Sequence, residues 1–331
     1  MEKTFHHRRS CRAFLLNQRL VAITILVVDA TVSAFAQSDV RTNSLNPVTV
    51  TGSRVETASF NAPFSVDVAE VNPAGIAQPG VNVSEVLAGI PGLVVQNRQN
   101  YAQDLQISVR GFGARSAFGV RGVKLITDGI PATNPDGQGQ AATFNLDTAE
   151  RIEVLRGPFA TIYGNDSGGV IQLFSRDGKG EPRVHAGVVG GSWGAIKVDV
   201  GSEGEAGGVG YVLDGSRFET AGFREHSAAT RYQEFAKFNF EPDEHSRLTV
   251  VASGLQQPET QDPLGLTWAT YQTNSQAVEP QALTFNTRKS IEHEQAGATY
   301  ERRFGDENRL QLLAYGGQRS VVQYLAIPRA P

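Results

Sequence analysis

The chain has 331 residues, of which 40% are hydrophobic and 19% are charged, and it includes 35 glycines. This glycine content favours many tight turns over long helices, as in a turn-rich β protein. The formal net charge is −4, and it falls to about −7 without the first 36 residues, which hold five Lys or Arg and two acids. An acidic chain of this kind argues against nucleic acid as a partner.

The first 36 residues have the organisation of a secretory signal peptide. Basic residues between Lys3 and Arg19 precede the apolar run Leu20 to Val28, and Ala34-Phe35-Ala36 is an A-x-A cleavage site. A transmembrane anchor is the weaker alternative, because the apolar run is about half the roughly 20 residues that span a bilayer. The only cysteine, Cys11, leaves with the signal, so we expect no disulfide or thiolate site in the mature chain.

A polar tail, residues 37–46, leads into an extended β-branched run, Asn46 to Arg54. Two interpretations are open for this run. It is either the first strand of the next domain, or a strand that is offered to the sheet edge of another protein.

The pattern from Phe60 to Arg176 is one of short strands, short helices and glycine turns, over a length near the usual size of a domain. A short helix containing Val86 and Leu87 is expected to end at Gly89 and Pro91. The expected strands are Phe64 to Val68, Leu93 to Gln96, Ile107 to Arg110, Val123 to Thr127, Ile152 to Leu155 and Val170 to Phe174. The sequence therefore predicts a mixed α+β domain here.

After Arg176 the sequence predicts seven strands, near 183–190, 195–202, 208–219, 230–240, 247–257, 294–304 and 309–320. The strand 230–240 places Tyr232, Phe238 and Phe240 on one face and Gln233 and Lys237 on the other. Short polar connections alternate with longer ones. This alternation is typical of a membrane β-barrel, whereas a soluble β-sandwich has no reason to segregate loop lengths.

Two motifs suggest enzyme or metal chemistry that their contexts do not support. Asn165 to Gly169 resembles the Gly-Asp-Ser-Gly-Gly around a chymotrypsin-like nucleophile, but no histidine lies in a matching context. In Glu292-His293-Glu294, neighbouring side chains of an extended chain point to opposite faces, so all three cannot reach one ion. We expect no enzyme activity, catalytic residue, metal site or cofactor.

The segment Glu150 to Pro158, followed by Tyr163-Gly164 and Gly168 to Ile171, resembles the end of the plug domain of TonB-dependent outer-membrane receptors. The resemblance implies an α+β plug domain followed by an antiparallel transmembrane β-barrel segment, with about 7 of about 22 strands. The implied organisation is a signal peptide at 1–36, a periplasmic tail at 37–59 with a TonB box at about 47–54, a plug at 60–176, and an incomplete barrel at 177–331.

The resemblance also implies roles for individual residues. Two plug loops, 110–122 and 128–140, correspond to the outward-facing apices that touch ligand in this family. Ligand contacts are expected from Phe112, Arg115, Phe118, Arg121, Asn134, Asp136 and Gln138, and TonB contacts from Pro47, Val48, Thr49, Val50 and Thr51. Arg110 and Arg156 would lock the plug against glutamates of barrel strands. For Arg110, Arg121 and the phenylalanines, a purely structural role inside the plug is the alternative.

The function that the resemblance implies is import of a scarce metal chelate across the Gram-negative outer membrane. A ferric siderophore is the first choice, because three arginines and two phenylalanines suit an anionic, partly aromatic ligand. Cobalamin, another chelate or a sugar are alternatives. The implied partners are TonB with its inner-membrane energising complex, the chelate and outer-membrane lipid. Competing interpretations are a surface-binding, phage or bacteriocin receptor without import, and a truncated receptor without function.

Overall fold

The computed structural model describes residues 49–50, 57–58, 61–62, 64–71, 79–98, 100–116, 118–157, 162–164, 166, 168–305 and 308–327. The chain divides into two units, Met1–Asn46 and Pro47–Pro331, and all described residues belong to the second. The expected signal peptide lies outside the described residues, as do Pro47, Val48 and Thr51 of the expected TonB box.

A two-stranded ribbon forms at the start of the described chain. Strand β1 (Thr49–Val50) pairs antiparallel with β2 (Thr57–Ala58), with Thr49 opposite Ala58 and Val50 opposite Thr57. The extended conformation expected for the β-branched run is confirmed at Thr49 and Val50, and the partner strand here comes from the same chain.

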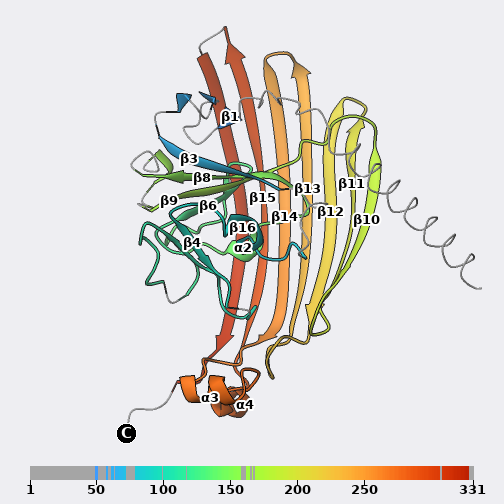
Figure 1. Ribbon diagram of the computed structural model, residues 1–331. Coiled ribbons are helices and arrows are strands. Elements are labelled where there is room, and N and C mark those ends of the chain that lie inside the picture. The colour runs from blue at the N-terminus through green and yellow to red at the C-terminus, as the bar shows by residue number, and fades with distance from the viewer. Residues whose placement is uncertain are drawn as a thin grey trace, which may run out of the picture. The chain divides into compact units, whose positions relative to one another are not determined.

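Residues 61–176 form the expected mixed domain, built around a five-stranded sheet with the order β3-β8-β9-β6-β7 (Figure 1). Its strands are β3 (Ser65–Glu70), β6 (Lys124–Thr127), β7 (Ile130–Pro131), β8 (Ala149–Arg156) and β9 (Gly169–Ser175). A separate pair joins β4 (Leu93–Gln96) to β5 (Gln106–Val109). The helices are α2 (Ser84–Leu87) and the 3₁₀ turn η2 (Ala141–Thr143). Among the described residues, no helix is long and apolar enough to cross a membrane.

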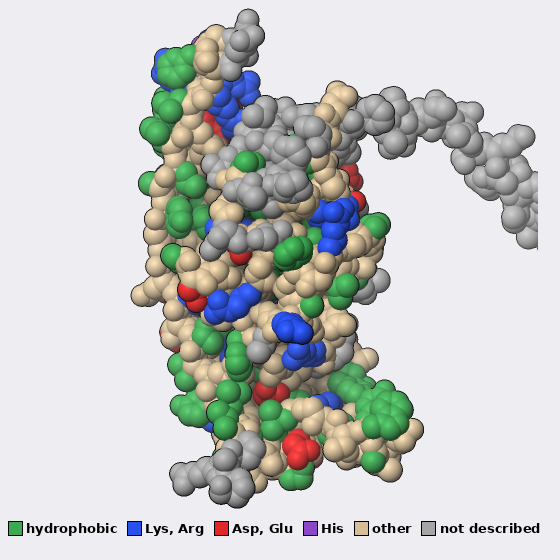
Figure 2. Space-filling model, turned by 90° about the vertical axis from the view of Figure 1, so that its left-hand side faces the viewer, with side chains coloured by type: hydrophobic (Ala, Val, Ile, Leu, Met, Phe, Trp, Pro, Cys, Tyr) green, Lys and Arg blue, Asp and Glu red, His purple; other side chains and the backbone are tan. Residues whose placement is uncertain are grey.

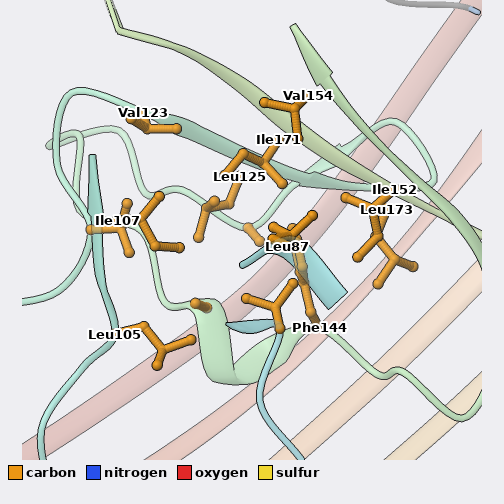
Figure 3. Packing of buried hydrophobic residues seen from close by; sticks show 14 of the residues in the cluster. Leu87, Leu105, Ile107, Val123, Leu125, Phe144, Ile152, Val154, Ile171 and Leu173 are labelled. Carbon is orange, nitrogen blue, oxygen red and sulfur yellow. The ribbon is translucent and has the colours of Figure 1, made fainter. Parts of the chain in front are cut away.

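The core of the mixed domain lies between the five-stranded sheet and the smaller elements. Ile152 and Val154 of β8 and Ile171 and Leu173 of β9 are fully buried, and they face Leu87 of α2 (Figure 3). Strand β9 is buried along nearly its whole length, which explains its continuous apolar run in the sequence. Burying each of these aliphatic side chains contributes roughly 1.5–3 kcal/mol to folding.

The second half of the described chain forms one antiparallel sheet of seven strands in sequential order. The strands are β10 (Arg183–Gly190), β11 (Ile196–Ala206), β12 (Val209–Thr220), β13 (Ala229–Asp243), β14 (Ser246–Gln261), β15 (Arg288–Phe304) and β16 (Asn308–Tyr324). All seven expected strands are confirmed. The predicted alternation of connection lengths is confirmed too, since β11–β12, β13–β14 and β15–β16 are joined by short turns.

The longest connection, 262–287 between β14 and β15, is shorter than expected and is folded. It contains α3 (Trp268–Thr273) and α4 (Pro280–Phe285), which the sequence did not predict. We call residues 262–287 the outer loop.

The face of the seven-stranded sheet that meets the mixed domain carries many polar side chains, with a small apolar cluster of Val212, Phe235 and Val251, and the other face is largely apolar. In β13, Gln233 and Lys237 are buried against the mixed domain, whereas Tyr232, Phe238 and Phe240 are exposed. Most soluble sheets bury the apolar face instead. This reversed pattern is the one expected of a barrel whose outer surface meets lipid and whose interior holds polar groups.

Candidate ligand-binding site

The two loops that the sequence singles out form one continuous surface. Val120 and Gly139 exchange two backbone hydrogen bonds, of 2.9 and 2.7 Å, which join loop 110–122 to loop 128–140. Near this bridge, Arg121 Nη2 lies 3.5 Å from Asp136 Oδ2, and Arg121 Nη1 donates to Asp136 O at 3.1 Å. The sequence predicted the two loops but not the bridge between them, because Val120 and Gly139 meet only in the folded domain.

Three of the expected ligand residues present free side chains. Phe112 is 51% exposed and Phe118 is 50% exposed. Arg115 is exposed, and no hydrogen bond or ion pair joins it to the rest of the described chain. An unpaired guanidinium and two exposed rings, three residues apart along the same loop, can pair with an anion and stack on an aromatic group of a ligand.

The other expected ligand residues stabilise the loops themselves. Arg121 and Asp136 pair with each other, and Asp136 Oδ1 also accepts from Gln138 N at 3.0 Å. Asn134 N donates to Gln138 O at 3.0 Å, which closes the turn. The side chain of Gln138 covers Gly119, where an added Cβ would lie 2.7 Å from Gln138 Cγ. These four residues therefore shape the surface from which Phe112, Arg115 and Phe118 project.

Asp104 lies beneath both loops and was missed by sequence reasoning. Its Oδ2 accepts from Gly119 N at 2.8 Å, and its Oδ1 accepts from the amide Nε2 of Gln140 at 2.9 Å. Lys289 of β15 donates to both carboxylate oxygens at 2.8 Å. One carboxylate thus connects the two candidate ligand loops with the seven-stranded sheet, and no local sequence signal marks it.

Basic side chains of the seven-stranded sheet hold the mixed domain in place. Lys197 Nζ lies 2.6 Å from Asp147 Oδ1, and Lys237 Nζ lies 3.4 Å from Asp128 Oδ1. Backbone carbonyls accept the remaining bonds, from Arg231 to Val81 O at 2.6 Å and from Arg319 to Ala132 O at 2.7 Å and Gln138 O at 3.3 Å. These contacts could have been predicted in part from the sequence, because the alternation of each strand places its basic residue on the face that meets the mixed domain.

The two arginines expected to lock the mixed domain bond within that domain or remain exposed. Arg156 donates to the Asp67 carboxylate and to Pro91 O. Arg110 is exposed, has a positive φ of 49° and donates its backbone N–H to Gly92 O at 3.2 Å. Among the described residues, neither side chain bonds to β10–β16, so a lock against barrel glutamates stays a prediction.

The model of the TonB-dependent Receptor Plug Domain family matches residues 58–171, which is nearly the whole mixed domain. The mixed domain is a plug domain of the TonB-dependent receptor family. The mixed domain, residues 61–176, is the plug, and the seven strands that follow are the first part of the barrel.

Curated relatives match just under half of the chain. A hemin receptor of Yersinia pestis is 32% identical over 155 residues, which cover 46% of this chain and 21% of the relative. An iron-regulated outer membrane virulence protein of Vibrio cholerae is 33% identical over 147 residues, which cover 44% of this chain and 22% of the relative. The chain therefore matches about a fifth of the length of these relatives.

Solved structures share the fold of both parts of the chain. The unliganded ferric citrate transporter FecA superposes with a TM-score of 0.67 at 24% identity, covering 81% of this chain and 42% of that protein. The ferric yersiniabactin uptake receptor FyuA of Yersinia pestis gives a TM-score of 0.61 at 18% identity, covering 78% of this chain and 41% of that protein. At these identities the likeness establishes the plug-and-barrel fold.

Proposed function

We propose that the receptor containing this chain imports an anionic metal chelate, with ferric siderophores as the first candidate class, across the Gram-negative outer membrane. We base this proposal on the unpaired Arg115 and the exposed Phe112 and Phe118, which share one loop of the plug, next to the paired Arg121 and Asp136. The names of the relatives support a role in iron or chelate uptake, since they include hemin and ferrienterobactin receptors.

The proposed partners follow from two other surfaces. The exposed apolar face of the seven-stranded sheet, with Val200, Leu213, Phe238 and Val250, fits outer-membrane lipid. Strand β1 lies in the proposed TonB box, about residues 47–54, of which Pro47 to Thr51 would add to a sheet edge of TonB. Energy from the inner membrane would then reach the plug through TonB. The receptor would reach the outer membrane after export through a signal peptide, residues 1–36, that is then cleaved.

A substitution tests binding, and a deletion tests import. Binding is measured by fluorescence quenching with ferric enterobactin, ferric citrate, hemin and cyanocobalamin as probes, and import by uptake of the radiolabelled metal. Arg115→Ala should weaken binding of an anionic chelate about tenfold, the loss of roughly 1.4 kcal/mol from a charge-assisted contact. Arg217→Ala, which removes an exposed arginine of β12 paired with Glu219, is the matched control.

Deletion of Val48 to Val50 should abolish uptake and leave binding unchanged. Uptake that persists after this deletion would overturn import through TonB. An Arg115→Ala receptor that binds every anionic probe as tightly as the Arg217→Ala control would overturn the assigned ligand surface.

A second candidate function rests on the outer loop. Trp268 is 70% exposed and stacks on Tyr271 with ring centroids 5.4 Å apart, and Leu283 and Phe285 are half-exposed beside them. Figure 2 shows hydrophobic side chains at the lower end of the molecule, the end at which Figure 1 places α3 and α4. This aromatic surface suits a protein ligand, and a structural relative has been solved as the FpvAI-pyocin S2 complex. A receptor that binds only a bacteriocin would keep its function after the Val48 to Val50 deletion.

A further inference from the structure

Five consecutive plug residues, Asn100 to Asp104, lie where the plug, the barrel wall and the outer loop meet. We call them the junction segment. It follows β4 and precedes β5, and it is a loop without regular secondary structure. A loop in such a position is free to move unless its polar groups are bound, so the contacts of each residue decide its behaviour.

Two residues of the junction segment, Asn100 and Gln103, bind the outer loop. Asn100 Nδ2 donates to Asp262 Oδ1 at 2.8 Å, and Gln103 Nε2 donates to Asp262 Oδ2. Asp262 is 1% exposed and begins the outer loop, where its backbone N–H donates to Thr287 O at 2.9 Å. A buried carboxylate that receives two plug amides therefore lies at the base of the loop, where α3 and α4 are joined to the barrel.

The centre of the junction segment is packed against the barrel wall. The Tyr101 ring lies 5.0 Å from the Phe218 ring of β12, and Tyr101 O accepts from Gln257 Nε2 of β14 at 2.8 Å. The guanidinium of Arg231 lies over the same ring at 5.9 Å. Ala102 is 1% exposed. The centre of the segment is therefore fixed to β12 and β14 by packing and by a hydrogen bond, so a displacement of one end is passed along the segment.

The last residue of the junction segment is bound to the candidate ligand loops. Asp104 accepts from Gly119 N and from Gln140 Nε2, and Lys289 of β15 neutralises it. The Asp104 side chain is 12% exposed and that of Lys289 is 4% exposed, so the pair is screened little by solvent. Gly119 directly precedes Val120, which makes the bridge between the two loops.

From these contacts we infer that the junction segment couples the outer loop to the ligand surface of the plug, with Asp262 and Asp104 as its two positioning residues. Displacing the outer loop pulls on Asp262, shifts residues 100–104 and releases Gly119 and Gln140 from Asp104. Conversely, a ligand that settles on loops 110–122 and 128–140 favours one position of the outer loop, because coupling between two sites is reciprocal. The inference rests on the proposed function only for the identity of the ligand surface, and its test needs no ligand.

Hydrogen–deuterium exchange of the whole receptor in detergent micelles tests the coupling. Asp262→Ala removes both amide contacts, and we expect faster exchange not only in the outer loop but also, by roughly threefold or more, in the peptide that contains Gly119 and Val120. Asp262→Asn is the milder variant, since it keeps an acceptor for Asn100 and loses the one for Gln103. It should give the same pattern with a smaller increase.

The matched control loosens the outer loop without touching the plug. Thr267→Ala removes the side chain that accepts from Thr270 N at the start of α3, at a cost of about 1 kcal/mol to that helix. It should speed exchange in the outer loop and leave the Gly119 peptide unchanged. Asn100→Ala should act like Asp262→Ala, and the double variant should add little.

Two results would overturn the coupling. One is an Asp262→Ala receptor whose faster exchange is confined to residues 262–287. The other is an Asn100→Ala receptor in which the Gly119 peptide exchanges no faster than in the Thr267→Ala control. Neither result would bear on whether the receptor imports a chelate, so failure of the coupling is distinguishable from failure of the proposed function.

Discussion

Lys197 Nζ of the barrel wall lies 2.6 Å from Asp147 Oδ1 of the plug, and only 3% of the lysine side chain is exposed. The same arrangement, with the cation on the barrel and the carboxylate on the plug, recurs for Lys237 with Asp128 and for Lys289 with Asp104. It is opposite in polarity to the expected lock of plug arginines on barrel glutamates. One contact has the expected polarity, because Arg176 Nε at the end of the plug lies 2.6 Å from Glu203 Oε2 of β11. In the described part of the chain, buried lysines of the strands and Arg176 therefore both hold the plug.

Lys197→Met should destabilise the folded receptor by about 3–5 kcal/mol, because it leaves Asp147 largely buried without its cation. The double variant Lys197→Met with Asp147→Asn should recover part of the loss, since the unpaired charge is removed as well. Lys179→Met is the control, because Lys179 pairs with Asp177 at 3.5 Å but is 78% exposed, and it should cost less than about 1 kcal/mol. Urea unfolding in micelles gives all three values, and equal costs for the two lysines would contradict the prediction.

The strands could be predicted from the sequence because their signal is local. Alternation along 230–240 gives both the strand and the faces of Lys237 and Phe238, and the structure confirms both. The ends of the strands were less predictable from the sequence. Pro258 indicates a loop, yet β14 continues to Gln261, because the register shifts between Gln257 and Thr260 and the proline falls within that irregularity.

The candidate site could be predicted only in outline. The composition of loops 110–122 and 128–140 pointed to Phe112 and Arg115, but the bridge between Val120 and Gly139 depends on how β5 and β6 are placed. Asp262 binds Asn100, and Asp104 binds Lys289, across more than 150 residues of sequence in each case. The helices α3 and α4 have six residues each, too few for a periodic apolar pattern to emerge.

Asp177, between the plug and the barrel, gives the receptor a defined pH dependence. Burial acts to raise its pKa, but Lys237 at 3.0 Å and Arg247 at 2.9 Å outweigh burial and hold the pKa of Asp177 well below its usual range. A carboxyl group with a lowered pKa in the folded state stabilises that state above its unfolded pKa of about 3.9. The stabilisation is lost as the pH falls towards the folded pKa.

Asp177→Asn should therefore lower the free energy of unfolding by about 1–3 kcal/mol at pH 7. The difference from the wild-type receptor should shrink below about pH 4. Glu181→Gln, an exposed carboxylate in the same connection, is the control and should have no effect at either pH. Urea unfolding at pH 7, 5 and 3.5 measures the difference. A loss that is the same at all three values would argue against an ionic role for Asp177.

Gly113 holds the start of the candidate ligand loop 110–122 close to β5. Its φ is 86°, and an added Cβ would lie 2.5 Å from Ile107 O and 2.9 Å from Arg121 O. Gly113→Ala should cost more than the roughly 1–3 kcal/mol of a strained backbone, because the backbone must also move apart. Gly111→Ala is a matched control, since Gly111 has a φ of 91° but nothing within 4 Å of an added Cβ. Thermal unfolding should show a larger loss for Gly113→Ala, and equal losses would mean that the close contact has no energetic weight.

Arg224 fixes the outer loop from the neighbouring connection between β12 and β13. Its guanidinium donates to Ala277 O at 2.8 Å, to Leu264 O at 2.5 Å and to Pro263 O at 3.1 Å. Burial lowers the pKa of Arg224 from its usual value, although Asp262 and Glu279 favour the charged form. One cation therefore binds three carbonyls of the outer loop, of which Pro263 O also accepts from Glu279 N at 3.2 Å.

Arg224→Ala should open the outer loop at least about tenfold more often, which corresponds to roughly 1.4 kcal/mol and is modest for the loss of three bonds to a charged donor. The outer loop contains no Lys or Arg, but it carries Trp268, Tyr271 and Phe285, which chymotrypsin can cleave. The initial rate of chymotryptic cleavage within 262–287 should rise by that factor. Arg217→Ala, in the same strand pair but away from the outer loop, should leave the rate unchanged. Cleavage of Arg224→Ala at the wild-type rate would show that the two helices hold the loop without Arg224.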